Sequence, residues 1–247
     1  MTLPSQLRGA DRLIVALDVP TIDAALRAVG QLDNVSFFKV GLQLFLTGGL
    51  PTLLQSLRTK KVFVDLKVPG DIGNTIRAVI EMCIDNGVTF LTLSESMPPA
   101  AIRSAAAARN ARGQTEPRLL TVPFLSSLDA GDLAETTGTR DDLETYVIRR
   151  ATSALGAGCD GVIASGPAIQ WCRTAFPRPT LIVSPGIRFD GATTDDHKRH
   201  TTPGEAIRLG ADYLVVGRPI LRAPDPRVAA DRVIHEIDAA LLQGIGG

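Results

Sequence analysis

The sequence of 247 residues contains 26 lysines and arginines, 26 aspartates and glutamates, and 45% hydrophobic residues. This composition is typical of a folded core, and the zero formal net charge argues against a general binder of nucleic-acid phosphates, which needs an excess of basic residues. Because neither an N-terminal signal-peptide core nor a run of about 18 apolar residues is present, we expect a cytoplasmic protein without a membrane partner.

Eight short runs rich in β-branched residues alternate along the chain with helical patterns. The predicted strands are Leu13–Leu17, Val35–Val40, Lys61–Leu66, Val88–Leu93, Arg118–Val122, Gly161–Ala164, Thr180–Val183 and Asp212–Val216. Helical patterns are clearest over Thr21–Leu32, Ile72–Asn86, Ala100–Arg112, Asp141–Ala157, Pro203–Leu209 and Asp225–Leu242. The strand runs do not alternate polar and apolar residues, which indicates a parallel sheet buried on both faces.

Eight strand-then-helix units in a chain of this length predict a (β/α)8 barrel that forms a single domain over residues 1–247. A doubly wound sheet is the alternative, but no G-x-G-x-x-G motif follows the first strand. The longest irregular stretches, Leu125–Arg140 and Ile187–Thr202, follow the fifth and seventh strands. In a barrel, both would lie at the C-terminal face, where active sites form.

Charged residues interrupt the apolar strands near their C-terminal ends. Asp18 follows the first strand, Lys39 lies in the second, and Asp65 and Lys67 lie at the end of the third, with Asp71 close behind. Residues two apart share a face of a strand, so Asp65 and Lys67 point the same way. Structural ion pairs at the barrel rim are one interpretation, but such pairs gain little over apolar packing. We therefore predict an alternating charged network of Lys39, Asp65, Lys67 and Asp71.

A phosphate site is predicted from the loops after the last two strands. Pro185-Gly186-Ile187-Arg188 follows the seventh strand, and Gly217-Arg218-Pro219 follows the eighth. Loops in these positions commonly bind phosphate in barrels, because glycine allows the backbone to approach closely and arginine donates a pair of hydrogen bonds.

With these residues in view, the chain resembles the orotidine 5′-monophosphate decarboxylase family over nearly its whole length. The matching motifs are Leu-Ile-Val-Ala-Leu-Asp18, Phe-Lys39-Val-Gly, Asp65-Leu-Lys67, Asp71-Ile-Gly-Asn-Thr75, Leu125-Ser126-Ser127, Pro185-Gly-Ile-Arg188, Asp-His197-Lys-Arg and Asp212-Tyr-Leu-Val-Val-Gly-Arg218-Pro. The resemblance implies a barrel that converts orotidine 5′-monophosphate to UMP without a cofactor or metal.

The resemblance also implies a role for each charged residue. Lys67 would face the carbon that loses CO2 and then protonate it, and Asp65 would lie against the substrate carboxylate. Lys39 and Asp71 would complete the alternating array. The carbanion lies in the ring plane, where the π system cannot delocalise it, so a fixed cation in a water-excluding site is the catalysis that this chemistry needs.

Further residues would bind the nucleotide and join two subunits. Asp18, Lys39 and Thr75 would contact the ribose region, Ser127 the pyrimidine edge, and Arg218 with Gly217 the phosphate. Active sites in the family lie at a homodimer interface, so Asp71 and Thr75 would reach the neighbouring subunit's site. His197 stands where the family commonly has a phosphate-contacting glutamine.

The sequence departs from the family pattern in two further places. Three residues, Val68-Pro69-Gly70, separate Lys67 from Asp71 where the family usually has two, and Ser94 follows the fourth strand where a histidine is common. Two alternatives therefore stay open: a Mg²⁺-dependent sugar-phosphate decarboxylase or aldolase of the same superfamily, or a non-catalytic barrel that binds a phosphorylated ligand. The first needs additional acidic metal ligands, for which Glu95 is a candidate.

Overall fold

The structure is a closed barrel of eight parallel strands, which are hydrogen-bonded in chain order with β8 beside β1. The computed structural model describes residues 8–69, 74–189 and 201–244. The strands are β1 (Leu13–Ala16), β2 (Phe37–Gly41), β3 (Lys61–Val68), β4 (Phe90–Leu93), β5 (Arg118–Thr121), β6 (Gly161–Ile163), β7 (Leu181–Ser184) and β8 (Tyr213–Val216). The predicted (β/α)8 barrel is confirmed.

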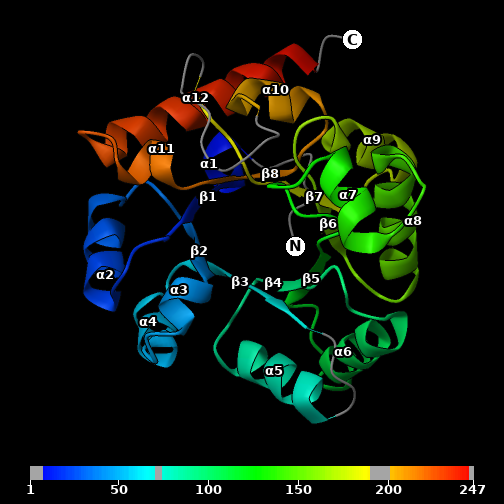
Figure 1. The fold of residues 1–247 in the computed structure, drawn as a ribbon. Coiled ribbons are helices and arrows are strands. Elements are labelled where there is room, and N and C mark those ends of the chain that lie inside the picture. Colours follow the sequence, from blue (N-terminus) through cyan, green and yellow to red (C-terminus); the bar gives the residue numbers. More distant parts are fainter. Residues whose placement is uncertain (1–7, 70–73, 190–200, 245–247) are drawn as a thin grey trace.

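Helices surround the strands on the outside of the barrel (Figure 1). They are α1 (Gly9–Arg12), α2 (Ile22–Gln31), α3 (Leu42–Phe45), α4 (Leu50–Ser56), α5 (Asn74–Asp85), α6 (Pro99–Ala111), α7 (Ala130–Thr137), α8 (Leu143–Gly156), α9 (Ala168–Ala175), α10 (Pro203–Arg208), α11 (Arg218–Leu221) and α12 (Pro226–Gly244). None of the helices in the described ranges is long and apolar enough to cross a membrane.

One predicted loop is partly wrong. The stretch Leu125–Arg140 contains helix α7, whose first turn is capped by Asp129. The Asp129 carboxylate accepts hydrogen bonds from the N–H groups of Gly131 and Asp132, at 2.9 and 3.1 Å, and the helix ends at Gly138 with φ of 66°. Caps of this kind stabilise short helices whose apolar pattern is weak. Most of the other long stretch, Ile187–Thr202, lies outside the described residues.

The strands are buried on both faces, as the uninterrupted apolar runs predict. One cluster fills the barrel interior with Ile14, Ala16, Phe37, Phe63, Phe90, Leu120, Leu181, Val183 and Val215. Phe90 contacts Phe37 and Tyr213 there, with ring centroids 5.1 Å apart in each pair. A second, larger cluster lies between the strands and the helices. The interior of the barrel is therefore a packed core.

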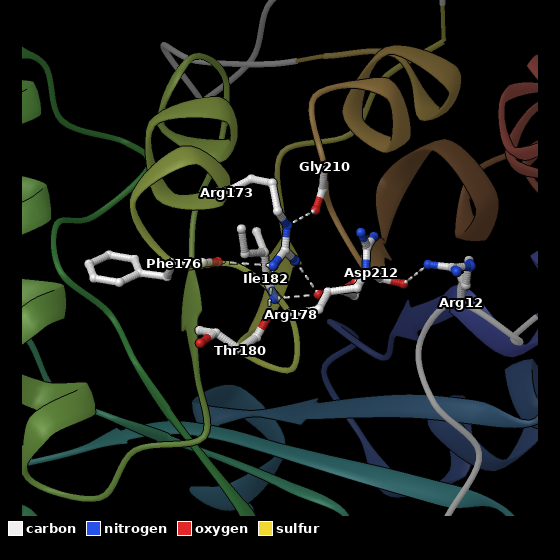
Figure 2. Close-up of polar contacts among 8 residues, drawn as sticks. All are labelled: Arg12, Arg173, Phe176, Arg178, Thr180, Ile182, Gly210 and Asp212. Carbon is white, nitrogen blue, oxygen red and sulfur yellow. Dashed lines mark hydrogen bonds and ion pairs between the residues drawn. The ribbon is translucent and has the colours of Figure 1, made fainter. Parts of the chain in front are cut away.

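Ion-pair networks hold the N-terminal ends of the later strands together. Figure 2 shows Asp212, which immediately precedes β8 and is fully buried. Its carboxylate accepts from Arg173 at 2.6 Å, from Arg178 at 3.2 Å and from the N–H of Ile182 at 2.9 Å, and Arg12 donates to its backbone carbonyl at 3.0 Å. The network ties β8 to β7, α9 and α1.

The same arrangement recurs two strands earlier. Asp160 precedes β6, and its carboxylate accepts from Arg109 on α6, from Arg118 at 3.0 Å and from the N–H of Leu119 at 2.8 Å. Both clusters lie at the N-terminal ends of strands, opposite the face where the charged residues of β1 to β3 lie. These buried charges therefore have a structural role, whereas the charged residues at the C-terminal ends of the strands are the candidates for the active site.

Candidate active site

The C-terminal ends of the strands surround a cavity of about 480 Å³. Hydrophobic residues from inside the barrel form its floor, among them Ala16, Phe63 and Val215. Its charged lining residues are Asp18, Lys39, Asp65, Lys67, Arg188, Arg218 and Arg222. These residues are spread over positions 18 to 222 of the chain. The parallel barrel brings them together because every strand ends at the same face.

Four charged side chains on one wall alternate in sign. The Lys39 Nζ lies 3.0 Å from Asp18 Oδ1 and 3.4 Å from Asp65 Oδ2, and the Lys67 Nζ lies 3.0 Å from Asp65 Oδ1. The predicted network is thus present for Lys39, Asp65 and Lys67, and Asp18 extends it. Asp71, the fourth predicted member, lies outside the described residues.

The two ends of the row are more exposed than its middle, since the Asp18 side chain is 53% exposed. The side chains of Lys39 and Asp65 are only 10% and 16% exposed, whereas that of Lys67 is 42% exposed. The inner pair is therefore fixed by its surroundings, and the Lys67 ammonium lies at the cavity edge, where a ligand can contact it. Gly41 adjoins this row: a Cβ there would lie 3.2 Å from Lys39 Nζ.

The inner pair keeps its charges despite burial. Burial of Lys39 favours the neutral amine, but the attraction of Asp65 and Asp18 outweighs burial and raises the pKa of Lys39. Burial of Asp65 favours the neutral acid, but the attraction of Lys39 and Lys67, with hydrogen bonds from Lys67 and Thr92, lowers the pKa of Asp65. Lys39 and Asp65 are therefore both ionised across the neutral pH range.

The Lys39–Asp65 pair is expected to make a constant contribution to the free energy of unfolding between about pH 5 and pH 9. A carboxylate with a lowered pKa stabilises the folded protein at pH values above its ordinary pKa of about 4. An ammonium with a raised pKa stabilises the folded protein at pH values below its ordinary pKa of about 10.4. The contribution of Asp65 is lost as the pH falls through its lowered pKa, and that of Lys39 as the pH rises through its raised pKa. Urea unfolding of wild type and Asp65→Asn across this range should give a constant difference in stability; a difference that changes steadily between pH 5 and pH 9 would contradict this.

The predicted phosphate loops also border the cavity. Pro185, Gly186 and Arg188 from the loop after β7 line it, as do Gly217 and Arg218 at the end of β8. The loop after β7 is closed at its base, because Arg188 donates its N–H to the Thr201 carbonyl at 3.0 Å. Sequence reasoning missed Arg222, which follows α11 and also lines the cavity. Its spacing of four residues from Arg218, one helical turn, was the available signal.

The other predicted binding residues are spread more widely. Ser126 lines the cavity, whereas Ser127 is exposed and is not among the described lining residues. Thr75 is exposed in the first turn of α5, away from the described lining of the cavity. His197 lies outside the described residues. The roles of these three residues stay predictions.

Possible metal ligands were also considered. Within residues 8–69, 74–189 and 201–244, no group of three or more His, Cys, Asp or Glu side chains is arranged to hold a metal ion. Glu95, the candidate acidic ligand, instead accepts a hydrogen bond from Ser94 at 3.3 Å. The three cysteines are buried and free, and burial raises the pKa of each thiol to about 12.

The family of the chain follows from comparison with known proteins. The model of the orotidine 5′-phosphate decarboxylase / HUMPS family matches residues 11–233. The chain belongs to this family. A curated orotidine 5′-phosphate decarboxylase of Rhodopseudomonas palustris strain BisB5 is 44% identical over 232 residues, which cover 93% of this chain and 96% of that protein. The resemblance stated from the motifs is confirmed.

Relatives from other organisms give the same result. Orotidine 5′-phosphate decarboxylase of Methylococcus capsulatus is 43% identical over 242 residues and covers 95% of each chain. The crystal structure of orotidine 5′-phosphate decarboxylase from Lactobacillus acidophilus is 30% identical, with a TM-score of 0.77 over 92% of this chain and 98% of that one. The family likeness therefore extends over the whole barrel.

Proposed function

We propose that this protein decarboxylates orotidine 5′-monophosphate to UMP in pyrimidine biosynthesis, as a carboxy-lyase that needs no cofactor. The observation that carries the proposal is the alternating row of Asp18, Lys39, Asp65 and Lys67 beside an arginine-lined wall in one cavity. Membership of the family and relatives more than 40% identical that are named for this activity support it.

The proposed chemistry follows from where the charges lie. The bond between the ring carbon and the carboxylate breaks, CO2 leaves, and the electron pair stays on the ring carbon in the plane of the ring. Lys67, at the cavity edge, stabilises this developing charge and then donates a proton to the same carbon. Asp65 holds that ammonium in place through an ion pair at 3.0 Å, and Lys39 fixes the other oxygen of Asp65. We assign Asp71 to the same array.

The cavity also matches the charge of the substrate. Its described lining includes five cationic and two anionic side chains, and the substrate carries a carboxylate and a phosphate group. We assign the phosphate to Arg218, the Gly217 backbone, Arg188 and Pro185, with His197 beside them, and the ribose to Asp18, Lys39 and Thr75. Because the phosphate is remote from the reacting carbon, its binding energy can be used to organise the array in the transition state.

Incubation of the purified protein with orotidine 5′-monophosphate tests the proposal. UMP, identified by chromatography, is the expected product, and a keto sugar phosphate should not be turned over. Turnover of the sugar phosphate in place of the nucleotide would instead support the related Mg²⁺-dependent reaction. If the nucleotide binds and no product forms, the result would instead support a non-catalytic barrel that binds a phosphorylated ligand.

Replacing Arg218 with alanine should weaken binding of UMP by about 2–4 kcal/mol, roughly 30- to 1000-fold, because a charge-assisted contact to phosphate is lost. Calorimetric titration with UMP measures this. Arg112→Ala is the control, because Arg112 forms an exposed ion pair with Asp85 away from the cavity. Equal affinities of the Arg218 variant and wild type would mean that the phosphate binds elsewhere.

We also propose that the protein is a homodimer with shared active sites. Leu42, Phe45 and Leu46 follow β2 directly and expose 54%, 42% and 73% of their surface. Beside them, Phe45, Leu50 and Leu54 line an apolar depression. This face directly follows β2, the strand that carries Lys39. We propose that a second copy binds here, and we assign Asp71 and Thr75 to the neighbouring subunit's site.

The Leu46→Glu variant tests the dimer, because a charge at the centre of an apolar contact disfavours association. In sedimentation velocity, wild type should be a dimer and the variant largely a monomer with much lower turnover. A wild-type protein that sediments as a monomer while it turns over substrate would contradict shared sites.

We further propose that residues 1–247 form one domain. We also propose a cytoplasmic location, which the buried, unpaired cysteines support.

A further inference from the structure

One buried hydroxyl group contacts two neighbouring members of the charged row, Asp65 and Lys67. Thr92, the third residue of β4, is 1% exposed. Its hydroxyl donates to Asp65 Oδ1 at 2.8 Å and accepts from the backbone N–H of Lys67 at 2.9 Å. The same Asp65 oxygen accepts from Lys67 Nζ at 3.0 Å. A single side chain on the neighbouring strand therefore contacts both the carboxylate and the backbone of the lysine.

The strand that carries these residues is irregular at this point. Val64 pairs with Leu91 and Val68 pairs with Leu93, so four steps along β3 correspond to two steps along β4. The extra length forms a bulge over Asp65, Leu66 and Lys67. In a bulge the ladder of backbone hydrogen bonds is broken, and a side chain has to replace the missing acceptor. The Thr92 hydroxyl takes that place for the Lys67 N–H.

The backbone of Lys67 is strained in this bulge. Its φ is 48°, and among the described residues it is the only one other than glycine with a positive φ. A non-glycine residue in the left-handed region costs about 1–2 kcal/mol and persists only when its surroundings hold it. The hydrogen bond from the Lys67 N–H to Thr92 is one such restraint, and the ion pair of Lys67 with Asp65 is another.

We propose that Thr92 is a positioning residue for the reaction: its hydroxyl fixes Asp65 and the strained Lys67 backbone so that the ammonium lies at the reacting carbon. The inference rests on the proposed function. The hydroxyl has one proton, which it donates to Asp65, and lone pairs, with which it accepts from Lys67. Serine has the same capacity, and valine, which has nearly the same shape, has none. Loss of the hydroxyl frees the Asp65 carboxylate to rotate and the Lys67 backbone to relax.

We expect the Thr92→Val substitution to slow the chemical step. Thr92 does not line the cavity in the described structure, so nucleotide binding should be preserved in the Thr92→Val variant. Misplacement of a catalytic group by about 1 Å costs on the order of 100-fold in rate. We therefore expect kcat to fall about 10- to 100-fold, with the Kd for UMP within about threefold of wild type.

The test compares Thr92→Val with Thr92→Ser and with Thr89→Val, a buried threonine before the other end of the same strand. Serine should restore kcat to within about fivefold of wild type, and Thr89→Val should leave kcat unchanged. If Thr92→Val does not fold, Thr92→Cys, whose thiol is a weak donor, is measured in the same way.

Three kinetic or binding results would overturn the inference. They are a kcat of Thr92→Val within twofold of wild type, a loss of kcat that serine does not restore, and a loss in UMP affinity as large as the loss in kcat. A crystal structure of Thr92→Val that retains the positive φ of Lys67 and the Asp65 orientation would do so independently of activity. Wild-type protein that does not turn over the nucleotide would contradict the proposed function, and the crystal structure would still test Thr92.

Discussion

The Lys67→Ala variant is expected to lose at least about 10⁴-fold in kcat while it still binds UMP within about tenfold of wild type. A positioned general acid contributes about 10²–10⁴-fold and a fixed charge at the developing carbanion about 10²–10³-fold, and Lys67 is assigned both roles. Binding is largely retained because the phosphate is assigned to the loops after β7 and β8, at the ends of other strands than the one that carries Lys67. The measurement is kcat for orotidine 5′-monophosphate together with a titration of UMP.

Lys61→Ala is the matched control for this experiment. Lys61 begins the same strand, β3, and is exposed at the opposite end of the barrel, so its removal should change kcat by less than about twofold. A Lys67→Ala variant with a kcat near that of wild type would remove Lys67 from the role of proton donor. A variant that loses UMP affinity and kcat to the same extent would show that Lys67 serves binding.

The Asp212→Asn variant is expected to lose about 3–5 kcal/mol of its free energy of unfolding. Asp212 is fully buried, and its carboxylate forms ion pairs with Arg173 and Arg178 (Figure 2). Neutralising it leaves the 15%-exposed Arg173 side chain without its countercharge, which is costly in a buried site. Chemical denaturation at neutral pH measures the loss.

Asp85→Asn is the control for this second experiment. Asp85 also forms an ion pair with an arginine, Arg112, at 2.9 Å, but its side chain is 60% exposed. Exposed pairs contribute about 0–1 kcal/mol, so the control should be nearly as stable as wild type. The kcat of folded Asp212→Asn should be close to that of wild type, because the network lies at the end of the barrel opposite the cavity. Equal losses of stability in the two variants would contradict a structural role for the buried network.

The fold and the charged residues were readable from the sequence for physical reasons. Strands buried on both faces need uninterrupted apolar runs, so Asp18, Lys39, Asp65 and Lys67 stood out as exceptions. Parallel strands in a closed barrel all end at one face, so the exceptions had to meet there. For the same reason, the glycine and arginine residues after β7 and β8 were predictable as part of the same cavity lining.

Other parts of the site depended on information that the sequence pattern does not contain. Thr92 is an ordinary β-strand residue by composition, and its importance arises from a bulge that changes the register of β3 against β4. Register at such an irregularity depends on the three-dimensional path of the chain. Likewise, α7 and α3 are short helices. Helices of this length depend on caps and packing more than on an apolar repeat.

Turnover of orotidine 5′-monophosphate by protein dialysed against a chelator tests most directly whether fixed side-chain charges alone support the reaction. We predict that kcat and kcat/KM are the same with excess chelator and with added Mg²⁺, and that UMP forms in both. Activity that disappears with the chelator and returns with Mg²⁺ would contradict it.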